Sequence, residues 1–73
     1  MTKEGTLFYD RDTGRYDVCF DDGDHYGGLH CGNTFEAYIG GEWIPTRIEY
    51  AHNDGWYIVG HIDISLDKLR IRM

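Results

Sequence analysis

The side chains of this sequence that bind zinc most readily belong to four histidines and two cysteines. They are Cys19, His25, His30, Cys31, His52 and His61. His30 and Cys31 are adjacent, and adjacent residues of a strand point to opposite faces, so one ion rarely takes both. The chain has no Cys-x-x-Cys and no His-x-x-x-His spacing. We therefore expect no metal site, with the thiols buried and the histidines bonded to backbone in loops.

Cysteine and carboxylate side chains are the remaining candidates for catalysis. Cys31 would need a neighbouring base to lower its pKa, and His30 is adjacent in sequence only. Strand alternation places Glu36 and Glu49 on the same outer face of the predicted sheet, and Asp17 is a possible third carboxylate. A hydrolase, however, needs a concave pocket that desolvates its acid. A small barrel fills its interior with its own side chains. We expect no catalytic residue, no cofactor and no enzymatic activity.

Charge is distributed unevenly along the chain. The formal net charge is −6 at pH 7, whereas a protein that binds phosphate backbones needs a basic face. Residues 1–36 carry eight of the thirteen acids, and residues 68–72 are locally basic. The aspartates among residues 21–24 lack the downstream glutamate of an EF-hand loop, so we expect a solvated turn there. Nucleic acid is therefore not an expected partner.

Targeting and membrane-spanning segments are not apparent. Residues 1–5 lack the apolar stretch of a signal peptide, and no apolar run approaches the ~20 residues of a membrane span. Two cysteines do not make a disulfide scaffold. We expect a cytoplasmic protein with free thiols and no association with a membrane.

Apolar and polar residues alternate with a period of two through most of the sequence, which predicts strands. The expected strands cover residues 5–9, 15–20, 34–39, 42–50, 56–59 and 70–72. Residues 21–28 contain three acids and three glycines and are expected to form a mobile loop. Residues 66–69 could form one 3₁₀ turn before the last strand, and no longer helix is expected.

Gly40 and Gly41 mark the clearest hairpin, because a diglycine favours a two-residue primed turn. Such a turn places Tyr38 opposite Trp43 on the face turned away from the core. The residues expected on the core face are Phe35, Ala37, Ile44 and Ile48. The residues expected on the outer face are Glu36, Tyr38, Trp43 and Arg47, with Glu36 and Arg47 forming a cross-strand ion pair.

The register of residues 56–59 depends on the length of the preceding loop. A loop of two or four residues turns Tyr57 and Val59 inward, and a loop of three turns Trp56 and Ile58 inward. Closing the sheet would remove its exposed edges. We predict one all-β domain over residues 1–73, a small SH3-like barrel of five or six antiparallel strands, with an open, strongly bent meander as the alternative.

Several motifs of the chain resemble a known family. They are Gly14-Arg15-Tyr16, Leu29-His30-Cys31-Gly32, Glu36, the segment Trp43-Ile44-Pro45-Thr46-Arg47-Ile48-Glu49, and Gly55-Trp56-Tyr57-Ile58-Val59-Gly60. The family is a domain of unknown function found in small uncharacterised proteins of Gram-positive bacteria and their mobile elements. The resemblance implies a cytoplasmic protein and supplies no catalytic residues. It also implies a glycine near Asp67 or Lys68, which this chain lacks.

Tyr38 and Trp43, rimmed by Glu36 and Arg47, have the composition of a protein-binding hot spot. Alternatively, the segment 21–33 covers these rings. We predict a non-catalytic interaction module that binds a protein partner through this face, as a monomer or weak homodimer. The alternative function is an acidic nucleic-acid mimic, a counter-defence protein that binds a basic nuclease or repressor.

Overall fold

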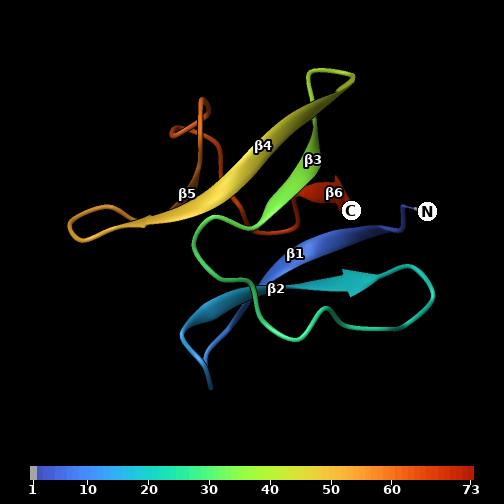
Figure 1. Cartoon of the computed structure of the whole chain (residues 1–73), viewed down its shortest axis with the longest axis horizontal. Helices are drawn as coiled ribbons and strands as arrows, with labels where there is room; N and C mark the ends of the chain where they lie inside the picture. Colours follow the sequence, from blue (N-terminus) through green and yellow to red (C-terminus); the bar gives the residue numbers. More distant parts are fainter. Residues whose placement is uncertain (1) are drawn as a thin grey trace.

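The computed structural model describes residues 2–73 as six strands without a helix (Figure 1). The strands are β1 (Glu4–Asp10), β2 (Arg15–Phe20), β3 (Thr34–Ile39), β4 (Glu42–Ala51), β5 (Gly55–Ile58) and β6 (Arg70–Arg72). They form one antiparallel sheet in the order β2-β1-β6-β3-β4-β5. The predicted all-β class with five or six antiparallel strands is confirmed, and the number is six. Across residues 2–73, no helix could serve as a membrane span.

The sheet is open, because its end strands β2 and β5 do not pair with each other. The free edge of β2 is occupied instead by the segment 24–29. Its backbone bonds to β2 through Phe20 N to Asp24 O (2.8 Å), Tyr26 N to Val18 O (3.1 Å) and Leu29 N to Tyr16 O (2.8 Å). The strand pairing therefore shows an open sheet, so the closed SH3-like barrel is not confirmed, and the place of β6 between β1 and β3 departs from a simple meander.

Asp17 holds this segment in place. Its Oδ1 accepts hydrogen bonds from the backbone N–H groups of Val18 (2.8 Å), Gly27 (2.9 Å) and Gly28 (2.9 Å), and Asp17 is only 7% exposed. Gly27 and Gly28 have φ of 104° and 103°, which glycine adopts without steric cost. The segment expected to form a mobile loop is therefore an irregular segment that is hydrogen-bonded along β2 and anchored by one carboxylate.

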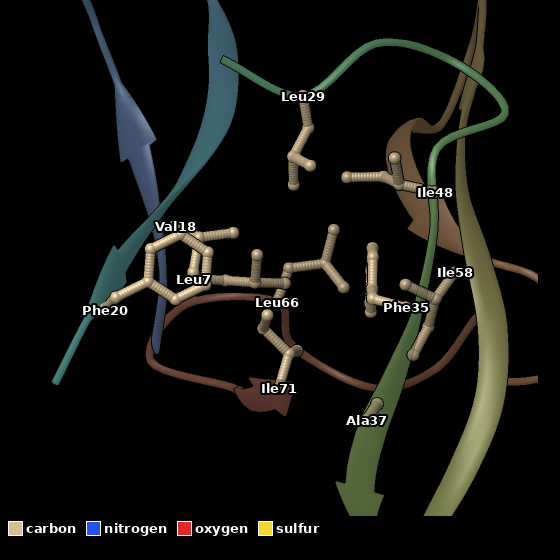
Figure 2. Close-up of a cluster of buried hydrophobic side chains, with 10 residues drawn as sticks. All are labelled: Leu7, Val18, Phe20, Leu29, Phe35, Ala37, Ile48, Ile58, Leu66 and Ile71. Carbon is tan, nitrogen blue, oxygen red and sulfur yellow. The ribbon is translucent and has the colours of Figure 1, made fainter. Parts of the chain in front are cut away.

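The core lies between the β1–β2 half and the β3–β4–β5 half of the bent sheet (Figure 2). The buried residues are Leu7, Val18, Phe20, Leu29, Phe35, Ala37, Ile48, Ile58, Leu66 and Ile71. Burial of Phe35, Ala37 and Ile48 is as predicted, whereas Ile44 is only half-buried. Leu29 and Leu66 come from irregular segments and fill the space between the halves, which strand periodicity does not reveal.

The register of both β4 hairpins follows from their turns. Tyr38 pairs with Trp43 across the diglycine turn, as predicted. Ala51 pairs with Gly55, so the β4–β5 loop has three residues, and Trp56 and Ile58 point inward. The ambiguity of this strand is thus resolved by loop length.

A hydrogen-bonded turn stands where one 3₁₀ turn was expected. Leu69 N donates to Leu66 O (3.1 Å), and Lys68 has φ of 65°, the one positive φ of a non-glycine residue among residues 2–73. A left-handed residue cannot continue a right-handed 3₁₀ turn. Lys68 therefore occupies a position at which the family resemblance implies a glycine.

Candidate functional site

Tyr38 and Trp43 form an aromatic pair on the outer face of β3 and β4. Their ring centroids lie 5.1 Å apart, with an interplanar angle of 57°. Tyr38 is 46% exposed and Trp43 is half-buried. Within the segment 21–33, which was expected as a possible cover, residues 24–29 run along β2, which β1 and β6 separate from β3, so these residues do not cover the pair.

Arg72 of β6 covers the face of Trp43. Its guanidinium carbon lies 4.4 Å from the ring centroid, a cation–π distance. The same guanidinium donates to both Glu36 oxygens, from Nε at 3.0 Å and from Nη2 at 3.3 Å. These hydrogen bonds raise the pKa of Arg72 above its ordinary value. Trp43 is therefore held between its tyrosine neighbour and a fixed cation.

The predicted ion pair between Glu36 and Arg47 is wrong. Arg47 bonds to Glu49 through Nε at 2.9 Å. Glu36 lies directly opposite Arg72 in the β3–β6 register, because β6 enters the sheet beside β3. Arg47 is four residues from Trp43 along β4, or ~13 Å at 3.3 Å per residue. The structure thus groups Glu36, Tyr38 and Trp43, and places Arg47 toward the other end of the same face.

Glu4 and Arg70 were missing from the sequence-based site. Together with Tyr38 and Trp43 they line a shallow hollow of about 410 Å³. Arg70 bonds to Glu4 (Nη2 to Oε1, 3.3 Å) and to Asp21 (Nη1 to Oδ1, 2.9 Å), and the bond to Asp21 raises its pKa. Periodicity does not predict these neighbours, because β6 pairs with strands more than thirty residues away in the sequence.

Several acids of residues 17–24 have partners within the chain. Lys3 Nζ contacts Asp22 at 2.9 Å and Asp24 at 3.0 Å. Hydrogen bonding between Lys3 and Asp22 raises the pKa of the lysine and lowers that of the aspartate. All three groups are exposed, so these pairs contribute little stability, but they neutralise part of the acidic surface.

Within residues 2–73, no group of three or more metal-ligating side chains comes together. Cys19 and Cys31 are exposed, so the expected burial of both thiols is wrong. Cys19 lies on the outer face of β2, and Cys31 lies in the turn before β3. Neither position belongs to the core face of the sheet.

A second cross-strand pair, Tyr50 and Trp56, lies on the concave face of β4 and β5. The ring centroids are 5.1 Å apart, and Trp56 Nε1 donates to the carbonyl oxygen of Gly14 at 3.0 Å. That bond joins the β4–β5 hairpin to the β1–β2 hairpin, which carries a further pair, Tyr9 and Tyr16, at 5.3 Å. This cluster is not predictable from strand periodicity alone, because the face that Trp56 occupies depends on the length of the β4–β5 loop.

Tyr16 contacts a carboxylate beside this cluster. Its hydroxyl donates to Asp67 Oδ1 at 2.8 Å. Burial of the ring, together with this hydrogen bond, raises the pKa of Tyr16 to about 12. The hydroxyl is the donor in this bond and holds the Asp67 carboxylate in place.

Comparison with known proteins identifies the family. The sequence pattern of a domain of unknown function, DUF5348, matches residues 5–73. The chain belongs to the DUF5348 family. No curated protein matches it. The DUF5348 chain is also similar to the crystal structure of a protein from Ruminococcus gnavus, with 54% sequence identity, a TM-score of 0.85, and coverage of 97% of this chain and 100% of that chain.

Proposed function

We propose that this DUF5348 chain is a non-catalytic interaction module that binds a protein partner through the outer face of β3 and β4. The observation that carries the proposal is the exposure of Tyr38 beside Trp43, over the hollow that Glu4 and Arg70 also line. Tyrosine, tryptophan and arginine are the residue types enriched at binding hot spots.

The arrangement around Trp43 favours binding, because it is ordered before a partner arrives. Arg72 and Glu36 hold the indole from one side, so little side-chain entropy remains to be lost. The Arg70–Glu4 pair supplies the polar rim that surrounds the apolar centre of protein interfaces. Arg47, paired with Glu49, would contact only the periphery of such a partner.

Affinity capture with matched tyrosine variants tests this proposal. Tyr38→Ala should remove the captured partner, while Tyr26→Ala should retain it. Tyr26 is 42% exposed in the segment beside β2 and lines neither aromatic hollow. If folded Tyr38→Ala protein captures the same partners in the same amounts, the outer face is not the site.

An acidic nucleic-acid mimic is the alternative proposal. Its support is the net charge of −6. Its weakness is that Asp21, Asp22 and Asp24 are paired with Arg70 or Lys3. Mimicry predicts a complex that salt weakens strongly, whereas an aromatic interface predicts a complex that salt weakens little.

The proposal also covers the origin of the protein, its cellular location, its relation to SH3-like barrels and its oligomeric state. The family resemblance supports an origin in Gram-positive bacteria or their mobile elements and a cytoplasmic location. The strong bend of the sheet supports a relation to SH3-like barrels. We propose a monomer or weak homodimer, in which the open edge of β5 would pair with a second copy.

A further inference from the structure

A hollow on the concave face lies apart from the outer aromatic site. It sits between the β1–β2 and β4–β5 hairpins, whose tips diverge in Figure 1, and has a volume of about 510 Å³. The residues that give it chemical character are Tyr9, Tyr16, Tyr50, Trp56, Asp54 and Asp67. Four aromatic rings and two carboxylates thus converge on one concave site.

We infer that this hollow binds an arginine side chain of a partner polypeptide. The first reason is charge complementarity. Among residues 2–73, those lining the hollow include two acids and no lysine or arginine. Arg15 lines the adjacent hollow across Trp56, and its Nη1 donates to the Leu29 carbonyl oxygen at 3.4 Å. A guanidinium gains from both aromatic faces and carboxylates, so it fits this lining.

The second reason is a precedent on the outer face of the same molecule. There, Arg72 lies over Trp43 of a Tyr–Trp pair and bonds to the Glu36 carboxylate. The pair formed by Tyr50 and Trp56 has the same centroid separation of 5.1 Å. The concave hollow therefore repeats the aromatic and acidic components of a guanidinium site, and the cation would come from a partner.

The third reason is that the hollow is held in shape from within. The bond from Trp56 Nε1 to the Gly14 carbonyl fixes the indole, and the bond from Tyr16 to Asp67 Oδ1 fixes the carboxylate. Tyr9 and Tyr50 remain 47% and 52% exposed and so can contact a ligand. Binding to such a fixed arrangement loses little conformational entropy.

The two sites are independent, because they lie on opposite faces of β4. Trp43 and Tyr50 are seven residues apart, and an odd separation along a strand reverses the face. The concave arginine site is therefore separate from the proposed protein-binding face of β3 and β4, and either site can exist without the other.

Nuclear magnetic resonance can separate the sites, because each contains one tryptophan. The probe is a blocked glycine–serine peptide with one arginine, and its control is the same peptide with citrulline, a neutral isostere. The arginine peptide should shift the indole N–H resonance of Trp56 saturably and leave that of Trp43 in place. Citrulline should produce no saturable shift.

Variants assign the effect to named groups. Asp67→Asn keeps an acceptor for Tyr16 but removes the charge, and should weaken binding about 5-fold. Tyr50→Ala should weaken binding by about the same factor. Tyr26→Ala, a substitution of an exposed tyrosine outside the hollow, should leave binding unchanged.

Four results would overturn the inference. One is the absence of a saturable Trp56 shift up to about 10 mM arginine peptide. Another is equal binding of the citrulline peptide. A third is undiminished binding by folded Asp67→Asn and Tyr50→Ala proteins. The last is equal binding of a lysine peptide, which would remove the assignment to arginine.

Discussion

Strand β4 carries one member of each of two tyrosine–tryptophan pairs, and the pairs differ in their surroundings. Tyr38–Trp43 and Tyr50–Trp56 are both directly opposed across antiparallel strands, with centroids 5.1 Å apart. The first pair has a cation of its own chain over the indole. The indole of the second donates to a backbone carbonyl, and carboxylates lie near it.

The difference shows that a residue pair does not define a binding site by itself. The outer pair already has its guanidinium, so its remaining exposed surface is the Tyr38 ring and the adjoining hollow. The hollow with acidic neighbours beside the inner pair has no lysine or arginine in its lining within residues 2–73, and Arg15 lines the adjacent hollow that Tyr50 and Trp56 also share. We therefore expect the outer pair to prefer apolar partner surfaces and the inner pair to prefer a cation.

The largest loss of stability is expected from Asp17→Ala. This substitution removes the carboxylate that anchors the segment beside β2 and changes neither tyrosine–tryptophan pair. It leaves three backbone N–H groups without their acceptor and releases the segment that carries Leu29. We expect a loss of about 3 kcal/mol of unfolding free energy in urea denaturation. Asp17→Asn, which keeps an acceptor oxygen, should lose clearly less; equal losses would contradict this account.

Arg72→Ala should make the outer pair resemble the inner one. It removes the cation from Trp43 and leaves Glu36 without its partner, at a cost of about 1 kcal/mol because the pair is partly exposed. The arginine peptide should then shift the Trp43 indole resonance as well as that of Trp56. An unchanged Trp43 resonance would show that the two environments are not equivalent.

Lys68→Gly should stabilise the turn that brings Asp67 to the concave hollow. Lys68 has φ of 65°, a conformation that costs a non-glycine residue roughly 1 kcal/mol. Glycine also gives the unfolded chain more backbone conformational entropy, which must be lost on folding and offsets part of this gain. We expect a net increase below about 1 kcal/mol in the free energy of unfolding, and a decrease would show that Lys68 makes a compensating contact.

Tyr16→Phe should change the free energy of unfolding least at neutral pH, and it should alter how that free energy depends on pH in alkaline solution. The pKa of Tyr16 is raised from 10.0 to about 12, so folding favours the protonated phenol. Its contribution is complete below about pH 10 and is lost as pH rises toward 12. The difference in stability between wild type and Tyr16→Phe should therefore shrink across that interval, and a constant difference would contradict the assignment.

Local patterns predicted the hairpins, because the information for each is contained in adjacent residues. The diglycine determined the pairing of Tyr38 with Trp43, and alternation determined the burial of Phe35 and Ala37. What could not be predicted depends on contacts between distant segments. Arg72 reaches Glu36 only because β6 enters between β1 and β3, and the cluster at Trp56 requires Gly14 from another hairpin.

The position of β6 has a consequence for the order of assembly. β1–β2 and β3–β4 can each form from neighbouring residues, but among the strands of residues 2–73 only β6 pairs with both β1 and β3. During synthesis the two halves therefore emerge before the strand that joins them is available. Until then, β1 and β3 would each display an unpaired edge, so the newly made chain should be most prone to aggregate in the interval before Arg70–Arg72 leaves the ribosome.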